Sequence, residues 1–253
     1  MPKKDLYSDL LSQDDSSPSD SRTVPNLFPK ITNTPYKLAI IGEAPGADEI
    51  DQGLPFVGYS GRLLDTFLSR FNILRDACFI GNICQYRPPG NKIASFNWDG
   101  PEISGGIAKL TTDLNTFRPN VVLLLGGSAL HAFKDPLIVP KKKKTKDDLS
   151  FIFPNSISNW RGSFFSSHIN SPLSLVKCIP SFHPAACLRQ YDYTPYLLLD
   201  IKRALDDSKL PDLSIPQRTL LVNLSYQETI QELDRILSLQ TPVGTDIEGF
   251  WEN

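Results

Sequence analysis

Residues 37–61 read KLAIIGEAPGADEIDQGLPFVGYSG, and this stretch decides the fold. Its first part, Lys37 to Ile41, is typical of a buried strand, and a loop rich in glycine and proline follows directly. Beyond Gly61 the apolar residues recur three and four positions apart, which predicts a helix. A strand that leads through a tight loop into a helix is the repeating unit of a parallel α/β sheet. Loops at the carboxyl ends of such strands bind ligands, so the loop after Ile41 is a candidate binding site.

The same order of elements recurs along the chain. Three further β-type runs are separated by helical stripes, and a last helix is expected over Tyr196 to Leu205. We therefore predict an α/β fold, a three-layer sandwich with a central four-stranded parallel sheet. The further runs are Cys78 to Ile83, Asn120 to Leu125 and Leu175 to Ile179, and the stripes are Leu63, Leu64, Phe67, Leu68 and Phe71 in one helix and Ile103, Ile107, Leu110, Leu114 and Phe117 in the other.

The composition indicates a globular protein of the cytoplasm. Hydrophobic residues make up 40% of the chain and charged residues 21%. No apolar run approaches the roughly 20 residues of a membrane span, and the first residues do not form a secretory signal. The net charge of −2 gives no overall attraction to DNA, so a contact with nucleic acid has to be local. The one dense basic run, Lys141 to Lys144 with Lys146, either follows phosphates or forms a solvated loop.

Shifts in composition divide the chain into four segments. Residues 1–34 are rich in serine, aspartate, proline and threonine, which predicts a disordered tail. The α/β domain is expected over residues 35–207. Prolines and charges over residues 208–218 indicate a linker, and residues 219–253 start a new unit.

Polar residues gather in three loops that follow predicted strands. The first loop, residues 42–61, lacks both the phosphate-loop and the dinucleotide-binding motifs. Its glycines indicate either a backbone that approaches a ligand closely or an ordinary structured turn. The other two loops run from Asn82 to Asn91 and from His183 to Arg189.

Together these loops resemble the family-four uracil-DNA glycosylases. The resemblance rests on GEAPG at 42–46, G-x-PFVG-x-x-G at 53–61, N-x-x-x-x-RPPGN at 82–91 and HPAACLR at 183–189. It extends from about Tyr36 to Leu205. The family has a parallel four-stranded sheet between helices, and it hydrolyses the N-glycosidic bond of uracil in DNA.

The resemblance implies a base pocket built from the first two loops. Phe56 resembles the aromatic platform of the family, Asn82 the residue that reads the base edge, and the backbone at Gly42 is expected to line the pocket. A flipped-out base needs such a π-face and such polar groups. A side-chain amide offers both a donor and an acceptor to O4 and N3 of uracil. A core phenylalanine and a turn asparagine are the structural alternatives.

The resemblance also implies catalytic residues. Breaking the glycosidic bond leaves negative charge on uracil, mainly toward O2, so a donor aimed at that oxygen assists the reaction. His183 is the candidate donor. Glu43 or Glu49 is expected to hold the attacking water and to stabilise the cationic sugar. A structural histidine and a solvated surface carboxylate are the alternatives.

Contacts with DNA are expected from the last loop and from the loop before it. Residues Ala185 to Arg189 resemble the family's minor-groove loop, in which an apolar wedge such as Leu188 fills the gap left by the flipped base. Arg189 and Lys92 are expected to contact phosphates.

The chain departs from the family at its metal cofactor. Family four holds an iron-sulfur cluster through two cysteines near the N-terminus, one just before Arg-Pro-Pro and one after it. Here Tyr86 precedes Arg87, no cysteine precedes Cys78, and Ile-Ser-Gly-Gly follows Glu102. We therefore expect no cluster. The cysteines, expected to be buried reduced thiols, are Cys78, Cys84, Cys178 and Cys187.

The last segment resembles the start of a different domain. Residues 219–253 predict a strand at Leu220 to Leu224, a helix opened by the capping box Ser225 to Glu228, and a strand at Val243 to Glu248. This order resembles the opening of the 3′-5′ exonuclease domain of family-A DNA polymerases, whose D-x-E carboxylates, here Asp246 and Glu248, bind metal. Divalent metal is expected only in a complete exonuclease domain, so this fragment should be inactive alone.

Two functions remain open from the sequence. The first is a uracil-DNA glycosylase at the N-terminus of a polymerase-like replication or repair protein of phage type. The second is a non-catalytic uracil-binding or DNA-binding module tethered to a family-A polymerase. Both have uracil-containing DNA as a partner, with replication proteins as further partners and no membrane contact, and only turnover separates them.

Overall fold

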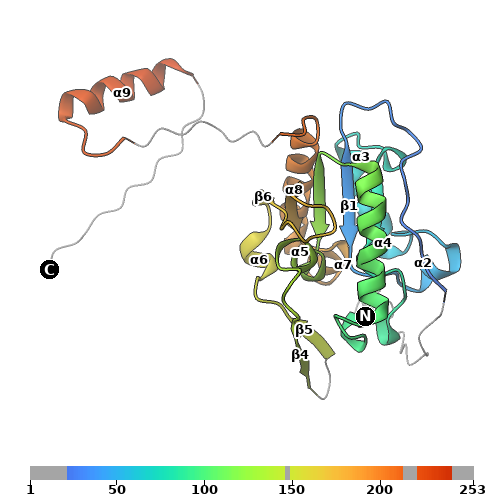
Figure 1. Cartoon of the computed structure of the whole chain (residues 1–253). Helices are drawn as coiled ribbons and strands as arrows, with labels where there is room; N and C mark the ends of the chain where they lie inside the picture. The colour runs from blue at the N-terminus through green and yellow to red at the C-terminus, as the bar shows by residue number, and fades with distance from the viewer. Residues whose placement is uncertain (1–21, 146–148, 213–220, 241–253) are drawn as a thin grey trace, which may run out of the picture. The chain divides into compact units, whose positions relative to one another are not determined.

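The computed structural model describes residues 22–145, 149–212 and 221–240 (Figure 1). The chain forms two compact units, divided between residues 214 and 215. The first unit holds a five-stranded sheet in the order β2-β1-β3-β7-β6, in which the first four strands are parallel and β6 is antiparallel to β7. The predicted sheet of parallel strands is confirmed, with β6 as an additional edge. The strands are β1 (Leu38–Gly42), β2 (Phe79–Asn82), β3 (Val121–Leu125), β6 (Phe165–Ser166) and β7 (Lys177–Ser181).

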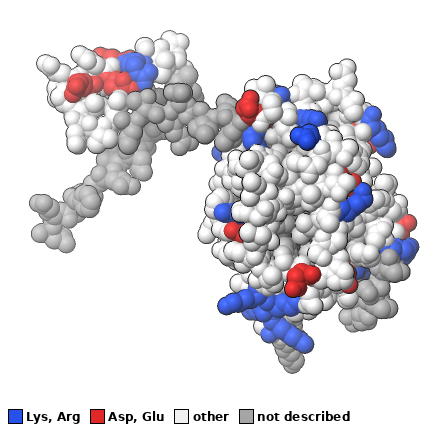
Figure 2. All heavy atoms as spheres, in the orientation of Figure 1, with Lys and Arg blue, Asp and Glu red and all other residues white. Residues whose placement is uncertain are grey.

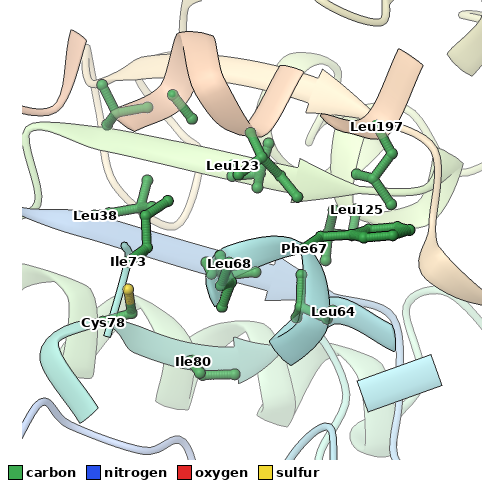
Figure 3. Close-up of a cluster of buried hydrophobic side chains, with 14 of the residues drawn as sticks. Leu38, Leu64, Phe67, Leu68, Ile73, Cys78, Ile80, Leu123, Leu125 and Leu197 are labelled. Carbon is green, nitrogen blue, oxygen red and sulfur yellow. The ribbon is translucent and has the colours of Figure 1, made fainter. Parts of the chain in front are cut away.

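Helices cover both faces of this sheet. Successive residues of a strand point to opposite faces, so Leu38 and Ile40 of β1 enter one core cluster while Ala39 and Ile41 enter the other. Figure 3 shows the first cluster, where Leu197 lies beside the strand residues. The predicted three layers are therefore present. The covering helices are α3 (Tyr59–Arg70) and α8 (Thr194–Asp207) on this face and α4 (Pro101–Phe117) and α5 (Gly127–Lys134) on the other.

The remaining elements of the first unit are short. They are α2 (Ala47–Gln52), α6 (Ile157–Trp160), α7 (Pro184–Arg189), the hairpin strands β4 (Lys141–Lys144) and β5 (Leu149–Ile152), and 3₁₀ turns at Arg75–Ala77, Pro89–Asn91, Ile93–Ser95 and Tyr191–Tyr193. Among the described residues, no helix combines the length and the apolar character needed to cross a membrane.

The prediction of a disordered tail up to residue 34 is wrong for residues 22–34. Val24 is only 2% exposed, and its N–H donates to the carbonyl of Gln85 (2.9 Å). Leu27 and Ile80 exchange two backbone hydrogen bonds, because β2 is an edge strand whose outer groups need partners. The polar composition of this segment concealed the few apolar residues that attach it. The earlier part of the predicted tail lies outside the described residues.

The predicted linker also begins too early at residue 208. Ser208 is fully buried, and its carbonyl accepts the N–H of Lys37 (3.0 Å). The ammonium group of Lys177 is buried with it and donates to carbonyls at the end of α8 and just beyond, which stabilises a helix C-terminus. These carbonyls belong to Asp207, Leu210 and Asp212, each at 2.8 Å.

The second unit contains α9 (Tyr226–Ser238). Its predicted capping box is confirmed: Ser225 Oγ accepts the N–H of Glu228, and Glu228 Oε2 accepts the N–H of Ser225 (2.8 Å). The predicted strand at Leu220 to Leu224 is absent over residues 221–224, which have no partner strand to pair with among the described residues. The predicted strand at Val243 to Glu248, with the carboxylates of Asp246 and Glu248, lies outside the described residues.

Two neighbouring glycines of α4 test how tightly this helix packs on the sheet. A Cβ on Gly106 would lie 2.4 Å from the backbone oxygen of Ile83, whereas a Cβ on exposed Gly105 would meet nothing within 4 Å. We expect Gly106→Ala to lower the free energy of unfolding by about 1–3 kcal/mol. Gly105→Ala should raise it by up to about 1 kcal/mol, because alanine favours the helix. Urea unfolding measures both, and equal effects would contradict the packing described.

Candidate active site

A cavity of about 470 Å³ lies where the four parallel strands end. Residues from the loops after β1, β2, β3 and β7 line it, as expected for the carboxyl edge of a parallel sheet. Gly42 lies next to two of the lining side chains, whereas Lys92 and Leu188 are not part of the lining. The cavity thus brings together six of the residues chosen from the sequence: Glu43, Glu49, Phe56, Asn82, His183 and Arg189.

The loop that carries Phe56 is held in a strained conformation. Phe56 has a φ angle of 54°, in the left-handed region that side chains other than glycine avoid. The carboxylate of Glu49, 8% exposed, fixes this loop: its Oε1 accepts the N–H groups of Val57 (2.8 Å) and Gly58 (2.7 Å). Its Oε2 accepts the N–H of Gly46 (3.0 Å). Both oxygens of Glu49 therefore accept hydrogen bonds from the backbone of the pocket loops.

Gly42 lets an aromatic ring and an amide meet at the end of β1. A Cβ at this position would lie 2.4 Å from Cζ of Phe56 and 2.6 Å from Oδ1 of Asn82. Both distances are shorter than real Cβ contacts, so a larger residue would displace both groups. The close backbone approach predicted from the glycines is present here, between the backbone and the pocket's own side chains.

Asn82 presents an unsatisfied amide to the cavity. The residue is 5% exposed, yet no described residue makes a hydrogen bond to its side chain, although buried amides usually find a partner. Its backbone is fixed on both sides, because Asn26 Oδ1 accepts its N–H (3.4 Å) and Gln85 Nε2 donates to its carbonyl (2.9 Å). This rigid amide is therefore available for a hydrogen bond with a polar group in the cavity.

The imidazole of His183 is neutral, and its tautomer is set by a helix cap. His183 is the N-cap of α7, and its Nδ1 accepts the N–H of Ala185 (3.1 Å). Burial, together with the positive charge of Arg189, lowers the pKa of His183 to about 4. A neutral ring that accepts at Nδ1 carries its proton on Nε2. The ring lies 5.6 Å from the ring of Phe56 at an angle of 26°, so both face the same space.

Glu43 is a half-buried carboxylate at the cavity wall. Its Oε2 accepts a hydrogen bond from Ser128 Oγ (2.5 Å). Burial raises its pKa, while Ser128 and the charge of Arg189 act in the opposite direction. The raised pKa makes this carboxylate a stronger base than an exposed one.

The sequence analysis missed the loop after β3. Gly126 and Gly127 line the cavity, and Ser128 at the start of α5 binds Glu43. The signal was available, because Gly-Gly-Ser directly follows the apolar run that ends at Leu125. Gly126 has a φ angle of 94°, and this conformation turns the chain from strand to helix at the cavity wall.

The predicted DNA-contacting residues lie at different places relative to the cavity. Arg189 lines it, and the neighbouring Leu188 is 36% exposed, so both stand at the end of α7. Lys92 is exposed directly after Asn91, a lining residue. The predicted last loop, residues 183–189, is a short helix capped by His183.

The cysteines do not fit a four-thiolate iron-sulfur cluster. Cys78 and Cys187 belong to the core cluster on one face of the sheet, whereas Cys84 and Cys178 belong to the cluster on the other face. Burial raises the pKa of Cys78 and of Cys84 to about 12, so these thiols stay protonated, whereas iron binds thiolates. Within the described ranges, no group of three or more histidine, cysteine or acidic residues is placed to hold a metal ion.

Comparison with known proteins identifies the family. The model of the uracil DNA glycosylase superfamily matches residues 29–204. The chain belongs to this superfamily. It is 32% identical over 165 residues to the type-4 uracil-DNA glycosylase of Saccharolobus solfataricus (64% of this chain, 67% of the relative). It is 31% identical over 176 residues to that of Archaeoglobus fulgidus (70% and 77%) and 29% identical over 180 residues to that of Pyrobaculum aerophilum (68% and 82%).

The superfamily match confirms the resemblance to uracil-DNA glycosylases. The matched residues, 29–204, lie within the first compact unit and contain every cavity residue described above. The exonuclease resemblance concerns residues outside this match.

The tautomer of His183 can be measured by NMR. We expect ¹⁵N shifts of a neutral ring with its proton on Nε2, unchanged between pH 8 and about pH 5, because the pKa of His183 is about 4. His183→Gln assigns the signal among the three histidines. A folded-state pKa below the ordinary 6.5 stabilises the fold above about pH 6.5, and this contribution is lost as the pH falls toward 4. A charged ring at pH 7, or a proton on Nδ1, would contradict the assignment.

Proposed function

We propose that the chain hydrolyses the N-glycosidic bond between uracil and deoxyribose in DNA. The observation that carries the proposal is the unpartnered amide of Asn82, facing one cavity with the ring of Phe56 and the neutral imidazole of His183. The relatives with 29–32% identity are named type-4 uracil-DNA glycosylases. The side chains that line the cavity are of the types that this reaction needs.

Uracil recognition follows from the first two groups. A nucleotide that leaves the stack enters the cavity and lies on the ring of Phe56. The amide of Asn82 then donates to O4 of uracil and accepts from N3–H. Cytosine presents the reverse pattern of donor and acceptor, and each unpaired buried group costs about 1–3 kcal/mol. The fixed backbone of Asn82 therefore gives selectivity for uracil.

Bond cleavage uses His183 and Glu43. As the bond between C1′ and N1 breaks, its electron pair goes to uracil, and Nε2–H of His183 donates to the developing charge at O2. Glu43 stabilises the cationic sugar and accepts a proton from water as the water oxygen bonds to C1′. The uracil anion then takes up a proton at N1 while Glu43 releases the one it accepted, so the products are free uracil and an abasic site. Glu49 supports this step indirectly, because its oxygens hold the loop of Phe56.

DNA contacts complete the proposal. Leu188, exposed at the end of α7, is the wedge that fills the gap in the duplex. Arg189 beside it and Lys92 contact phosphates. Arg189 also favours the negatively charged leaving group, because its charge acts on the same cavity.

The polymerase setting is a further proposal that rests on sequence alone. The motif Thr245-Asp246-Ile247-Glu248 and the capped helix before it support an exonuclease-like second unit. In that setting uracil would be removed near a replication site. The gene sequence around this chain tests it, since a gene without polymerase motifs would refute the fusion.

A uracil-containing duplex tests turnover directly. Treatment with the chain and then with alkali should break the strand at the uracil, because an abasic site is alkali-labile. Asn82→Asp should reduce the single-turnover rate about 10- to 100-fold, because it replaces a donor to O4 with an acceptor. Asn115→Asp, on the exposed side of α4, is the matched control and should keep the wild-type rate. Tight uracil binding without strand breakage would favour the non-catalytic module instead.

The two carboxylates should respond differently to the same substitution. Glu43→Gln should lower the single-turnover rate by about 100-fold or more, because it removes the group that accepts the proton. Glu49→Gln should mainly lower the free energy of unfolding, by about 1–3 kcal/mol, because charge-assisted bonds to three N–H groups are lost. Excision kinetics and thermal unfolding of both variants measure these effects. The reverse pattern would assign the role of proton acceptor to Glu49.

A further inference from the structure

A lysine-rich hairpin projects from the domain between α5 and α6. Its strand β4 consists of Lys141–Lys144, all exposed, and pairs antiparallel with β5, with Lys142 opposite Phe151. Figure 1 shows the hairpin extending past the ends of the parallel strands, and Figure 2 shows blue lysine atoms gathered there. With a net charge of −2 for the whole chain, this is a strong local concentration of positive charge.

Aromatic side chains anchor the base of the hairpin. Phe151 and Phe153 pack around Trp98 with ring centroids 5.5 and 5.6 Å away, and His131 lies 4.9 Å from Phe153. Lys142 Nζ donates to Asn97 Oδ1 (3.0 Å) and lies over the ring of Phe151. The described part of the hairpin is therefore fixed to the domain.

The same anchor joins the hairpin to the cavity wall. A Cβ at Gly127 would lie 3.2 Å from the ring of Phe153, and Gly127 lines the cavity. Phe153 follows β5 directly. A single layer of side chains therefore separates the anchored end of the hairpin from the cavity. The lysines consequently extend from the rim at which DNA has to arrive.

The outer lysines of β4 are not neutralised by any carboxylate in the described part of the chain. Among the described residues, no carboxylate forms an ion pair with Lys141, Lys143 or Lys144. Four consecutive like charges repel one another, and a nearby polyanion removes this cost. Because alternate residues of a strand point in opposite directions, Lys141 and Lys143 face away from the side on which Lys142 packs.

We propose that the lysines of β4, Lys141–Lys144, bind the phosphate backbone of the duplex beside the uracil. This inference rests on the proposed function, because that function brings DNA to the cavity rim. The contacts are with phosphates, so they add affinity without sequence preference. The four residues of β4 span about 13 Å, or about four base pairs, so the contact lies on one flank of the flipped nucleotide.

Salt dependence of DNA binding tests the hairpin. Affinity for DNA falls as salt rises, and each phosphate contact makes the slope of log affinity against log salt steeper by about 0.9. Lys141→Ala, Lys143→Ala and Lys144→Ala combined should make this slope less steep by up to about 2.7 and raise the Kd about tenfold or more near 150 mM salt. Lys142 is left in place because it packs on Phe151. The triple substitution to arginine is the matched control, since it keeps the charge and should keep the slope.

Duplexes with thymine in place of uracil separate this inference from the proposed function. The change in slope should be the same on both duplexes, so it can be read even if the chain removes no uracil. Two shortened duplexes, each cut about three base pairs from the uracil on one side, locate the contact. Only one of the two truncations should abolish the difference in salt slope between wild type and the alanine variant. An unchanged slope, an equal loss in the arginine variant, or a difference that survives both truncations would overturn the proposal.

Discussion

The missing side chain at Gly42 is the constraint on which the pocket depends. Only because β1 ends in a residue without Cβ can the ring of Phe56 and the amide of Asn82 meet over the same backbone. Phe56 follows β1 along the chain, and Asn82 ends the neighbouring strand β2, which pairs in parallel with β1 so that Gly42 lies beside Asn82. The sheet register thus sets how the ring of Phe56 and the amide of Asn82 lie relative to each other in the cavity.

This close contact is maintained by polar groups that are themselves buried. Glu49 binds three backbone N–H groups and thereby holds Phe56 at a φ angle that the residue would otherwise avoid. His183 uses Nδ1 to cap α7, which leaves Nε2–H to face the cavity. In both cases hydrogen bonds with the backbone fix the position of a cavity residue before any ligand binds.

The sequence predicted the parallel strands and several residues of the cavity because both depend on local patterns. Apolar runs gave β1, β2, β3 and β7, and the loop motifs gave Phe56, Asn82 and His183. What it missed depends on long-range contacts. Val24 is buried only because the outer edge of β2 accepts it, and composition alone does not reveal such a partner. The support role of Glu49 likewise arises from residues eight and nine positions away.

The attachment of residues 22–34 bears on the missing cluster ligands. In the family that the motifs resemble, cluster cysteines come from the N-terminal segment, the residue before Arg-Pro-Pro and the region after it. Here residues 22–34 are joined by hydrogen bonds to the segment after β2 and to α4: the N–H of Val24 donates to Gln85, and Asn26 Nδ2 donates to Asp113 of α4 (2.8 Å). Because Asn26 also accepts the N–H of Asn82, this junction reaches a residue of the cavity wall directly. The buried amides of Asn26 and Gln85, with the carboxylate of Asp113, therefore fix the backbone of Asn82.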